Sequence, residues 1–205
     1  MSEEYNASEI DVLTGLEPVR KRPSMYLGDL SNPNLTTRLA FQTLCHAIDE
    51  SIEGNCNSIL MNVGKSKITT TYNAGLPLDP HPAAEGLPAA IMFLSLHMAC
   101  HNQKKNLEVG SELCELGLAV LNGVCSKLVA TVVHREKTAK FIFEKGKLTN
   151  SPKLSDTSSP DSTEITAELD PSILPNTDFC ITKIRTEAKR ILGQYNISVS
   201  LKETS

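Results

Sequence analysis

The stretch that decides the fold is Phe41–Val63, FQTLCHAIDESIEGNCNSILMNV. Apolar side chains at Leu44, Ile48 and Ile52 recur every four residues, which is typical of one face of an amphipathic helix. Gly54 is a residue type that commonly ends a helix, and the apolar run after it has the character of a short strand. The stretch therefore predicts a helix that leads directly into a strand.

Periodicity along the rest of the chain predicts helices and strands without strict strand–helix–strand alternation. Such a mixture favours an α+β fold, a two-layer sandwich in which helices cover one face of a mixed β-sheet. The predicted helices are Ser8–Val19, Asn34–Glu53, Leu87–Cys100, Ser111–Val124 and Thr177–Leu192. The predicted strands are Met25–Leu27 (a short extended piece), Ile59–Val63, Ile68–Tyr72, Leu128–His134, Ala139–Glu144, Glu164–Leu169 and Ile197–Leu201.

We expect residues 1–205 to form a single domain, because this length suffices for one closed core and no internal repeat divides it. Residues 1–7 are polar and are predicted to form an N-terminal arm. Residues 147–163 are rich in Ser, Thr, Pro and Asp, and are predicted to form a flexible loop.

Charge and composition exclude several classes of function. The formal net charge is −4, whereas phosphate binding needs a basic excess, so no direct nucleic-acid partner is expected. No run approaches about 18 apolar residues and the chain opens with acidic residues, so neither a membrane span nor a secretory signal is expected. The six cysteines show no CxxC spacing, which favours a reduced, cytoplasmic protein.

Residues 41–56 resemble, without a gap, the nucleotide-site helix of the ATPase domain of type IIA topoisomerases, the B subunits of DNA gyrase and topoisomerase IV. Ile10–Gly28 (IDVLTGLEPVRKRPSMYLG) is similar to the opening of that domain, and Val109–Asn122 and Ile184–Leu201 are similar to later segments. The resemblance implies a GHKL (Bergerat-like) ATPase fold. It stops at Ser205, where the family continues into a transducer domain, so that domain is not expected here.

The resemblance places Gln42 where the family has its catalytic glutamate, and His46 where it has a magnesium-binding asparagine. Positions four apart on a helix point into the same pocket. A glutamine accepts no proton at neutral pH and can only orient a water, and histidine prefers softer ions than magnesium. We therefore expect no catalytic residue and no metal here, and interpret both side chains as fillers of a vacated pocket.

The family's adenine-contacting aspartate corresponds to Tyr72, in a run that is one residue shorter than the family's and includes Gly75. If the register slips by one, Asn73 takes that place and can accept a hydrogen bond. Neither register provides a carboxylate. Thr163 matches a family threonine near the adenine site.

The family's glycine-rich phosphate-binding lid corresponds to Ser111–Gly117 (SELCELG), in which Gly117 is the only glycine. Glu112 and Glu115 are new carboxylates in this run. Two interpretations are open: the carboxylates face and repel a triphosphate, or the segment is an ordinary helix. Both disfavour ATP, so no cofactor is expected.

Zinc is a further possibility to weigh, because six Cys and His residues surround the same site if the resemblance holds. No pair of them has the spacing of a zinc finger or knuckle, so a zinc site is not expected. These residues are Cys45, His46, His97, Cys100, His101 and Cys114.

The favoured function is a pseudo-ATPase domain that acts as a protein-interaction or regulatory module, dimerising or pairing with a gyrase or topoisomerase IV subunit. One alternative is a topoisomerase-type domain with weak ATP binding or hydrolysis, and another is a binder of a different small ligand in the altered pocket. The degenerate nucleotide pocket is predicted to comprise His46, Tyr72, Asn73, Gly75, Glu112, Glu115, Gly117 and Thr163, with Gln42 at the former catalytic position.

Overall fold

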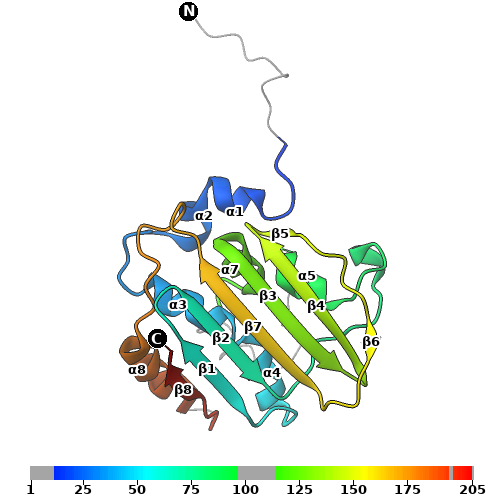
Figure 1. Ribbon diagram of the computed structural model, residues 1–205. Helices are drawn as coiled ribbons and strands as arrows, with labels where there is room; N and C mark the ends of the chain where they lie inside the picture. The colour runs from blue at the N-terminus through cyan, green and yellow to red at the C-terminus, as the bar shows by residue number, and fades with distance from the viewer. Residues whose placement is uncertain (1–11, 97–113, 194–195, 205) are drawn as a thin grey trace, which may run out of the picture.

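The computed structural model describes residues 12–96, 114–193 and 196–204 and contains an eight-stranded mixed sheet (Figure 1). The strand order is β5-β4-β3-β7-β2-β1-β8, and β6 pairs with β4. Neighbours are antiparallel except β1 and β8, which are parallel. The strands are β1 (Ile59–Val63), β2 (Lys67–Tyr72), β3 (Cys125–His134), β4 (Lys137–Glu144), β5 (Lys147–Leu148), β6 (Ser155–Asp156), β7 (Ser162–Leu169) and β8 (Ser200–Glu203).

One face of the sheet is apolar and covered by helices, whereas the other face is polar and faces solvent (Figure 1). Burial alternates along the strands, so that Leu128, Ala130 and Val132 of β3 are fully buried and their neighbours are partly exposed. Successive side chains in a strand point to opposite faces, which explains this alternation. The predicted α+β fold with helices on one face of a mixed sheet is confirmed.

The helices are shorter than the sequence pattern predicts. No helix within the described ranges is both long and apolar enough to cross a membrane. The helices are α1 (Glu17–Lys21), α2 (Pro23–Leu27), α3 (Leu35–Gln42), α4 (Cys45–Ile52), the 3-10 turn η2 (Pro82–Ala84), α5 (Ala90–Ser95), α7 (Leu118–Gly123) and α8 (Ile181–Leu192).

The prediction of one helix over Asn34–Glu53 is wrong, because the chain breaks between α3 and α4 at Thr43. The Thr43 amide and hydroxyl both donate to the Ala40 carbonyl, at 3.2 and 2.7 Å, so this turn is tighter than an α-helix. The hydroxyl oxygen also lies 2.6 Å from that of Thr70 in β2. The break therefore fixes the junction of α3 and α4 against the buried face of the sheet.

Two predictions near the N-terminus are also corrected. Residues 12–16 are not helical, so the described part of the predicted helix Ser8–Val19 begins at Glu17, and residues 1–11, which include the predicted arm, lie outside the described chain. Met25–Leu27 is helical rather than extended, because Pro23 starts α2 in the first turn, where its fixed φ and missing N–H suit a helix.

The predicted helix Ser111–Val124 is wrong over residues 114–117, since α7 begins only at Leu118. Gly117 precedes it with φ of +83°, a conformation that interrupts a right-handed helix and that side chains other than glycine rarely adopt. Residues 111–113 lie outside the description.

The segment 147–163, predicted as a flexible loop, contains β5, β6 and the start of β7. Between β5 and β6 the Asn150 side chain makes hydrogen bonds to the β4 backbone like those of a neighbouring strand. Its Oδ1 accepts from the Ile142 amide at 2.8 Å, and its Nδ2 donates to the Lys140 carbonyl at 2.7 Å. The segment therefore runs back along β4 and pairs with it at β5 and β6, which its composition did not indicate.

Arg20 connects α1 to the sheet through one partly buried network. Its Nη1 donates to the carbonyls of Gly123 and Cys125, at 3.0 and 3.1 Å, and its Nη2 lies 2.5 Å from Asp170 Oδ2. Burial alone would raise the pKa of Asp170, but hydrogen bonds from Arg20 and Ser172 outweigh it and lower this pKa below its ordinary value.

We expect Asp170→Asn to lower the free energy of unfolding at pH 7 by roughly 2–3 kcal/mol, because it leaves Arg20 without its carboxylate. Since the folded-state pKa is depressed, this stabilisation is complete above the unfolded value of about 4 and is lost as pH falls through the folded value. The difference in free energy of unfolding between variant and wild type, measured by urea unfolding, should therefore be smaller at about pH 3 than at pH 7.

The matched control is Asp156→Asn, which breaks the exposed Asp156–Lys137 pair. Exposed pairs contribute little, so this variant should unfold at nearly the wild-type urea concentration. An equal loss in both variants would contradict a special role for the Arg20 network.

Candidate functional site

Gln42 is the last residue of α3 and is fully buried. Its Oε1 accepts a hydrogen bond from the Gly117 amide at 2.9 Å, and its Nε2 donates to the Arg38 carbonyl at 2.7 Å. The Cys45 thiol also points at Oε1, with a sulfur–oxygen distance of 3.8 Å. The carboxamide is therefore bonded at both ends to the protein itself.

Gly117 stands where the chain enters α7, and the bond from its amide to Gln42 joins the start of α7 to the end of α3. An exposed amide ahead of a helix is the kind of donor that binds phosphate oxygens. Here the Gly117 amide donates its hydrogen bond to the side-chain oxygen of Gln42 instead.

His46 lies in the first turn of α4 and packs on the end of β2. Its Nδ1 is 3.2 Å from the Tyr72 hydroxyl, and the two rings are tilted with centroids 5.6 Å apart. Its Nε2 lies 3.7 Å from Glu50 Oε1, one helical turn further along α4. Both ring nitrogens of His46 therefore face protein groups.

Tyr72 is the last residue of β2, and only 2% of it is exposed. Burial raises the pKa of the Tyr72 phenol far above its ordinary range, against the lowering effect of a hydrogen bond with Thr163, so the group stays neutral. Thr163 faces Tyr72 across the β2–β7 ladder, and its hydroxyl donates to the Ala74 carbonyl at 2.8 Å. The tyrosine ring thus fills the space between α4 and the end of the sheet.

Asn73 points away from this cluster. Its Oδ1 accepts from the amides of Asn57 and Ser58, at 3.1 and 2.9 Å, and its Nδ2 donates to Asn57 Oδ1 at 2.9 Å. The side chain therefore organises the turn that precedes β1, and its carbonyl oxygen is already an acceptor there.

Gly75 is required by a close approach of backbones. A Cβ at this position would lie 2.3 Å from the Val133 carbonyl oxygen and 2.7 Å from the Cβ of His134. Only glycine lets this loop pack against the end of β3.

Glu115 pairs with Arg38, with Nε and Oε1 2.5 Å apart, at a half-exposed position on α3. The pair holds the segment before α7 onto α3 and directs this carboxylate towards a cation. Glu112 lies outside the described residues, so the interpretation that it faces a triphosphate stays a prediction.

The cysteine and histidine cluster is only partly described, since His97, Cys100 and His101 lie outside the described chain. Among the described residues no group of three or more His, Cys, Asp or Glu could hold a metal ion. A hydrogen bond with Cys45, together with burial, raises the pKa of the Cys114 thiol well above its ordinary value.

The structure thus brings Gln42 to Gly117 and places Tyr72 between His46 and Thr163. It turns Asn73 and Glu115 to other partners. Sequence reasoning missed Arg38, which binds Gln42 through its backbone and Glu115 through its side chain. The four-residue spacing of Arg38 and Gln42 was a visible signal for the first contact. No local signal marks the second.

Comparison with known proteins finds similarity to B subunits of DNA gyrase and DNA topoisomerase 4. The B subunit of DNA gyrase from Campylobacter jejuni is 36% identical over 151 residues, which cover 72% of this chain and 19% of the relative. The B subunit of DNA topoisomerase 4 from Salmonella typhimurium is 33% identical over 149 residues, 71% of this chain and 23% of the relative. The B subunit of DNA gyrase from Treponema denticola is 30% identical over 199 residues, 96% of this chain and 31% of the relative.

No family model matches the chain. The chain spans about a fifth to a third of the length of these relatives. The similarity extends over most of the chain, and the helix-covered mixed sheet agrees with it. The chain is therefore a gyrase-B-like domain of the GHKL type.

Proposed function

We propose that this domain is a pseudo-ATPase, which neither binds nor hydrolyses ATP and works as a protein-interaction or regulatory module. The observation that carries the proposal is that the side chains of the candidate nucleotide site bond to other groups of the protein. Gln42 is bonded to Gly117, and His46 and Thr163 enclose Tyr72.

ATP hydrolysis needs a base or water-orienting group, a metal ligand and donors for the phosphate oxygens. A carboxamide cannot act as the base, and the oxygen with which Gln42 would orient a water accepts from the Gly117 amide instead. That same bond takes the Gly117 donor away from any phosphate. One contact therefore removes two of the required groups.

The contacts of His46 and Tyr72 disfavour recognition of the metal ion and of the adenine ring. A histidine between Tyr72 and Glu50 is a poor replacement for an oxygen ligand of magnesium. The buried Tyr72 ring takes up volume beside Thr163, where the resemblance places the adenine, and Asn73 is turned away. Binding would require this packed cluster to open.

For the positive function we propose pairing with a second copy, or with a gyrase or topoisomerase IV subunit. The relatives are named as such subunits, and the resemblance implies that the opening segment of the domain makes the dimer. Around this segment Val12 and Met25 are 82% and 71% exposed, so two apolar side chains are available there for a contact. The described cysteines are free thiols, which supports action in a reducing compartment, the cytoplasm.

Calorimetry of the wild-type protein with ATP and Mg²⁺ should give no saturable heat at millimolar nucleotide. Gln42→Glu, which restores the family's residue, should not create ATPase activity. It should instead lower the free energy of unfolding by about 1–3 kcal/mol, because a carboxylate cannot donate to the Arg38 carbonyl.

Asn62→Asp is the matched control, since it makes the same amide-to-carboxylate change on the solvent-facing side of β1 and should alter stability little. Saturable ATP binding or Mg²⁺-dependent turnover by the wild type would overturn the pseudo-ATPase assignment. Turnover by Gln42→Glu would contradict the packed, closed state of the site.

Light scattering and pull-down with purified ATPase domains of gyrase B and topoisomerase IV B test the pairing. We expect a dimer or a mixed complex, and we expect Met25→Glu to weaken it at least tenfold by placing a charge in an apolar contact. Leu154→Glu, a similar change at a 42% exposed leucine outside the opening segment, should have no effect. A strictly monomeric protein that captures neither domain would contradict the pairing.

A further inference from the structure

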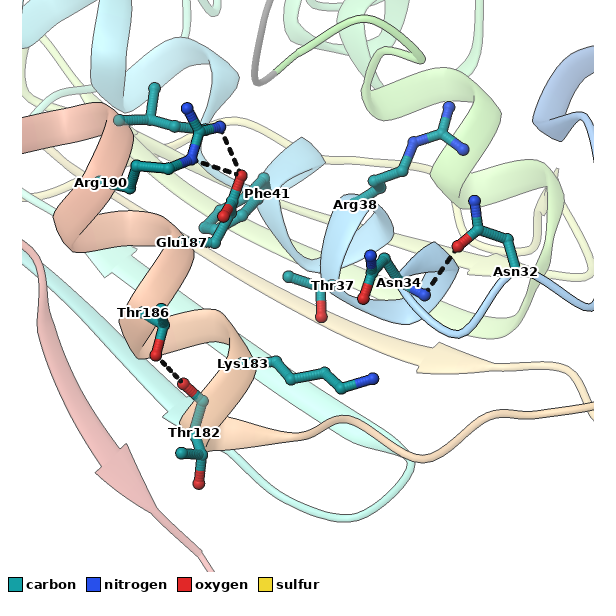
Figure 2. A pocket seen from close by; sticks show the side chains of 11 residues that line it. Asn32, Asn34, Thr37, Arg38, Phe41, Thr182, Lys183, Thr186, Glu187 and Arg190 are labelled. Atoms are coloured by element: carbon teal, nitrogen blue, oxygen red, sulfur yellow. Dashed lines mark hydrogen bonds and ion pairs between the residues drawn. The ribbon is translucent and has the colours of Figure 1, made fainter.

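A groove of about 460 Å³ separates α3 from α8, on a side of α3 that Gln42 does not line (Figure 2). Its size falls in the range of small-molecule sites. The lining residues on which the argument rests are Thr37, Arg38 and Phe41 from α3, and Lys183, Glu187 and Arg190 from α8.

Lys183 reaches from α8 towards the start of α3, where its ammonium donates to the Pro33 carbonyl at 3.0 Å. An ammonium has three N–H donors, so two are left for a ligand. Within the described chain Lys183 has no carboxylate partner. The first turn of α3, which carries partial positive charge, lies at the same end of the groove, and Asn34 makes no side-chain cap bond to it among the described residues.

Thr37 supplies a second, independent observation. It is 5% exposed, and its hydroxyl has no hydrogen-bond partner among the described residues. A buried hydroxyl without a partner costs free energy, so such groups are uncommon unless a ligand or water bonds to them. Figure 2 shows the Thr37 and Lys183 side chains extending into the space between the two helices.

The charge of the groove is positive overall, with three cations and one carboxylate among the lining residues. Glu187 is neutralised by Arg190, whose Nε and Nη2 lie 3.1 and 2.5 Å from its Oε1. Arg38 adds a guanidinium at the rim, paired with Glu115. The Phe41 ring and Ile191 give the groove an apolar floor.

We propose that this groove is a binding site for a small phosphate monoester. The phosphate lies at the Thr37–Lys183 end, where it accepts from the Lys183 ammonium, the Thr37 hydroxyl and the first turn of α3. The organic group lies on Phe41. This site does not depend on the proposed loss of ATP binding, since Thr37 and Lys183, which hold the phosphate, are not residues of the candidate nucleotide site. Arg38 borders both sites, through its bonds to Gln42 and Glu115.

The test is an amide-resolved NMR titration of the full chain with ribose 5-phosphate and with inorganic phosphate, at constant ionic strength and with ribose as the neutral control. We expect saturable shifts for residues 34–38 and 182–187, with ribose 5-phosphate binding more tightly than phosphate and ribose giving none. Lys183→Met should weaken binding about tenfold or more, and Thr37→Val about three- to tenfold.

Lys189→Met is the matched control, because it removes the same charge from an exposed position of α8 that does not line the groove. Thr37→Val also separates the proposal from a structural role, since loss of an unpartnered buried hydroxyl should not lower the urea midpoint. The proposal is overturned if the wild type gives no saturable shifts at ligand concentrations up to about 10 mM, which would detect even very weak binding. It is also overturned if Lys189→Met weakens binding as much as Lys183→Met.

Discussion

The eight-stranded sheet presents alternate side chains to two environments, and its apolar face needs a continuous cover. Helices α3, α4, α5 and α7 provide it, so the ends of these helices meet the buried side of the sheet (Figure 1). The candidate site with Gln42, His46 and Tyr72 lies in this contact layer. A site in such a layer is filled either by a ligand or by the protein's own side chains, because an unfilled space there costs packing energy.

In this domain the polar groups of that site satisfy one another. The Gln42 amide, the Gly117 N–H, the Tyr72 hydroxyl and the Thr163 hydroxyl all have partners within the chain. A site that had merely lost catalytic residues would leave some of these groups unpaired and costly. The pairing supports the proposal that this site is rebuilt as part of the core.

The fold class and the longer strands could be predicted from the sequence, because alternation of buried and exposed residues is a local signal that the structure preserves in β1, β2, β4 and β7. The short strands β5 and β6 were missed, and the last strand is Ser200–Glu203 rather than the predicted Ile197–Leu201. The bounds of the helices could not be predicted from the sequence. The break at Thr43 depends on a contact with Thr70 on another element, and the late start of α7 depends on the backbone conformation of Gly117. In the candidate site, the assignment of positions rests on the resemblance and stays a prediction. The bond between Gln42 and Gly117 joins residues 75 positions apart and has no local signature.

The parallel pairing of β8 with β1 bears on the order in which the chain folds. Leu60 and Ser200 are register partners, so the ladder closes most of the chain into one loop of about 140 residues. The hairpin of β1 and β2, by contrast, closes over a few residues. Loop-closure entropy and folding rate both favour local contacts, so we expect the hairpin to form early and β8 to dock late. The edge of the sheet at β8 is therefore completed late, and a nascent chain exposes the β8-facing edge of β1 until residues 200–203 emerge.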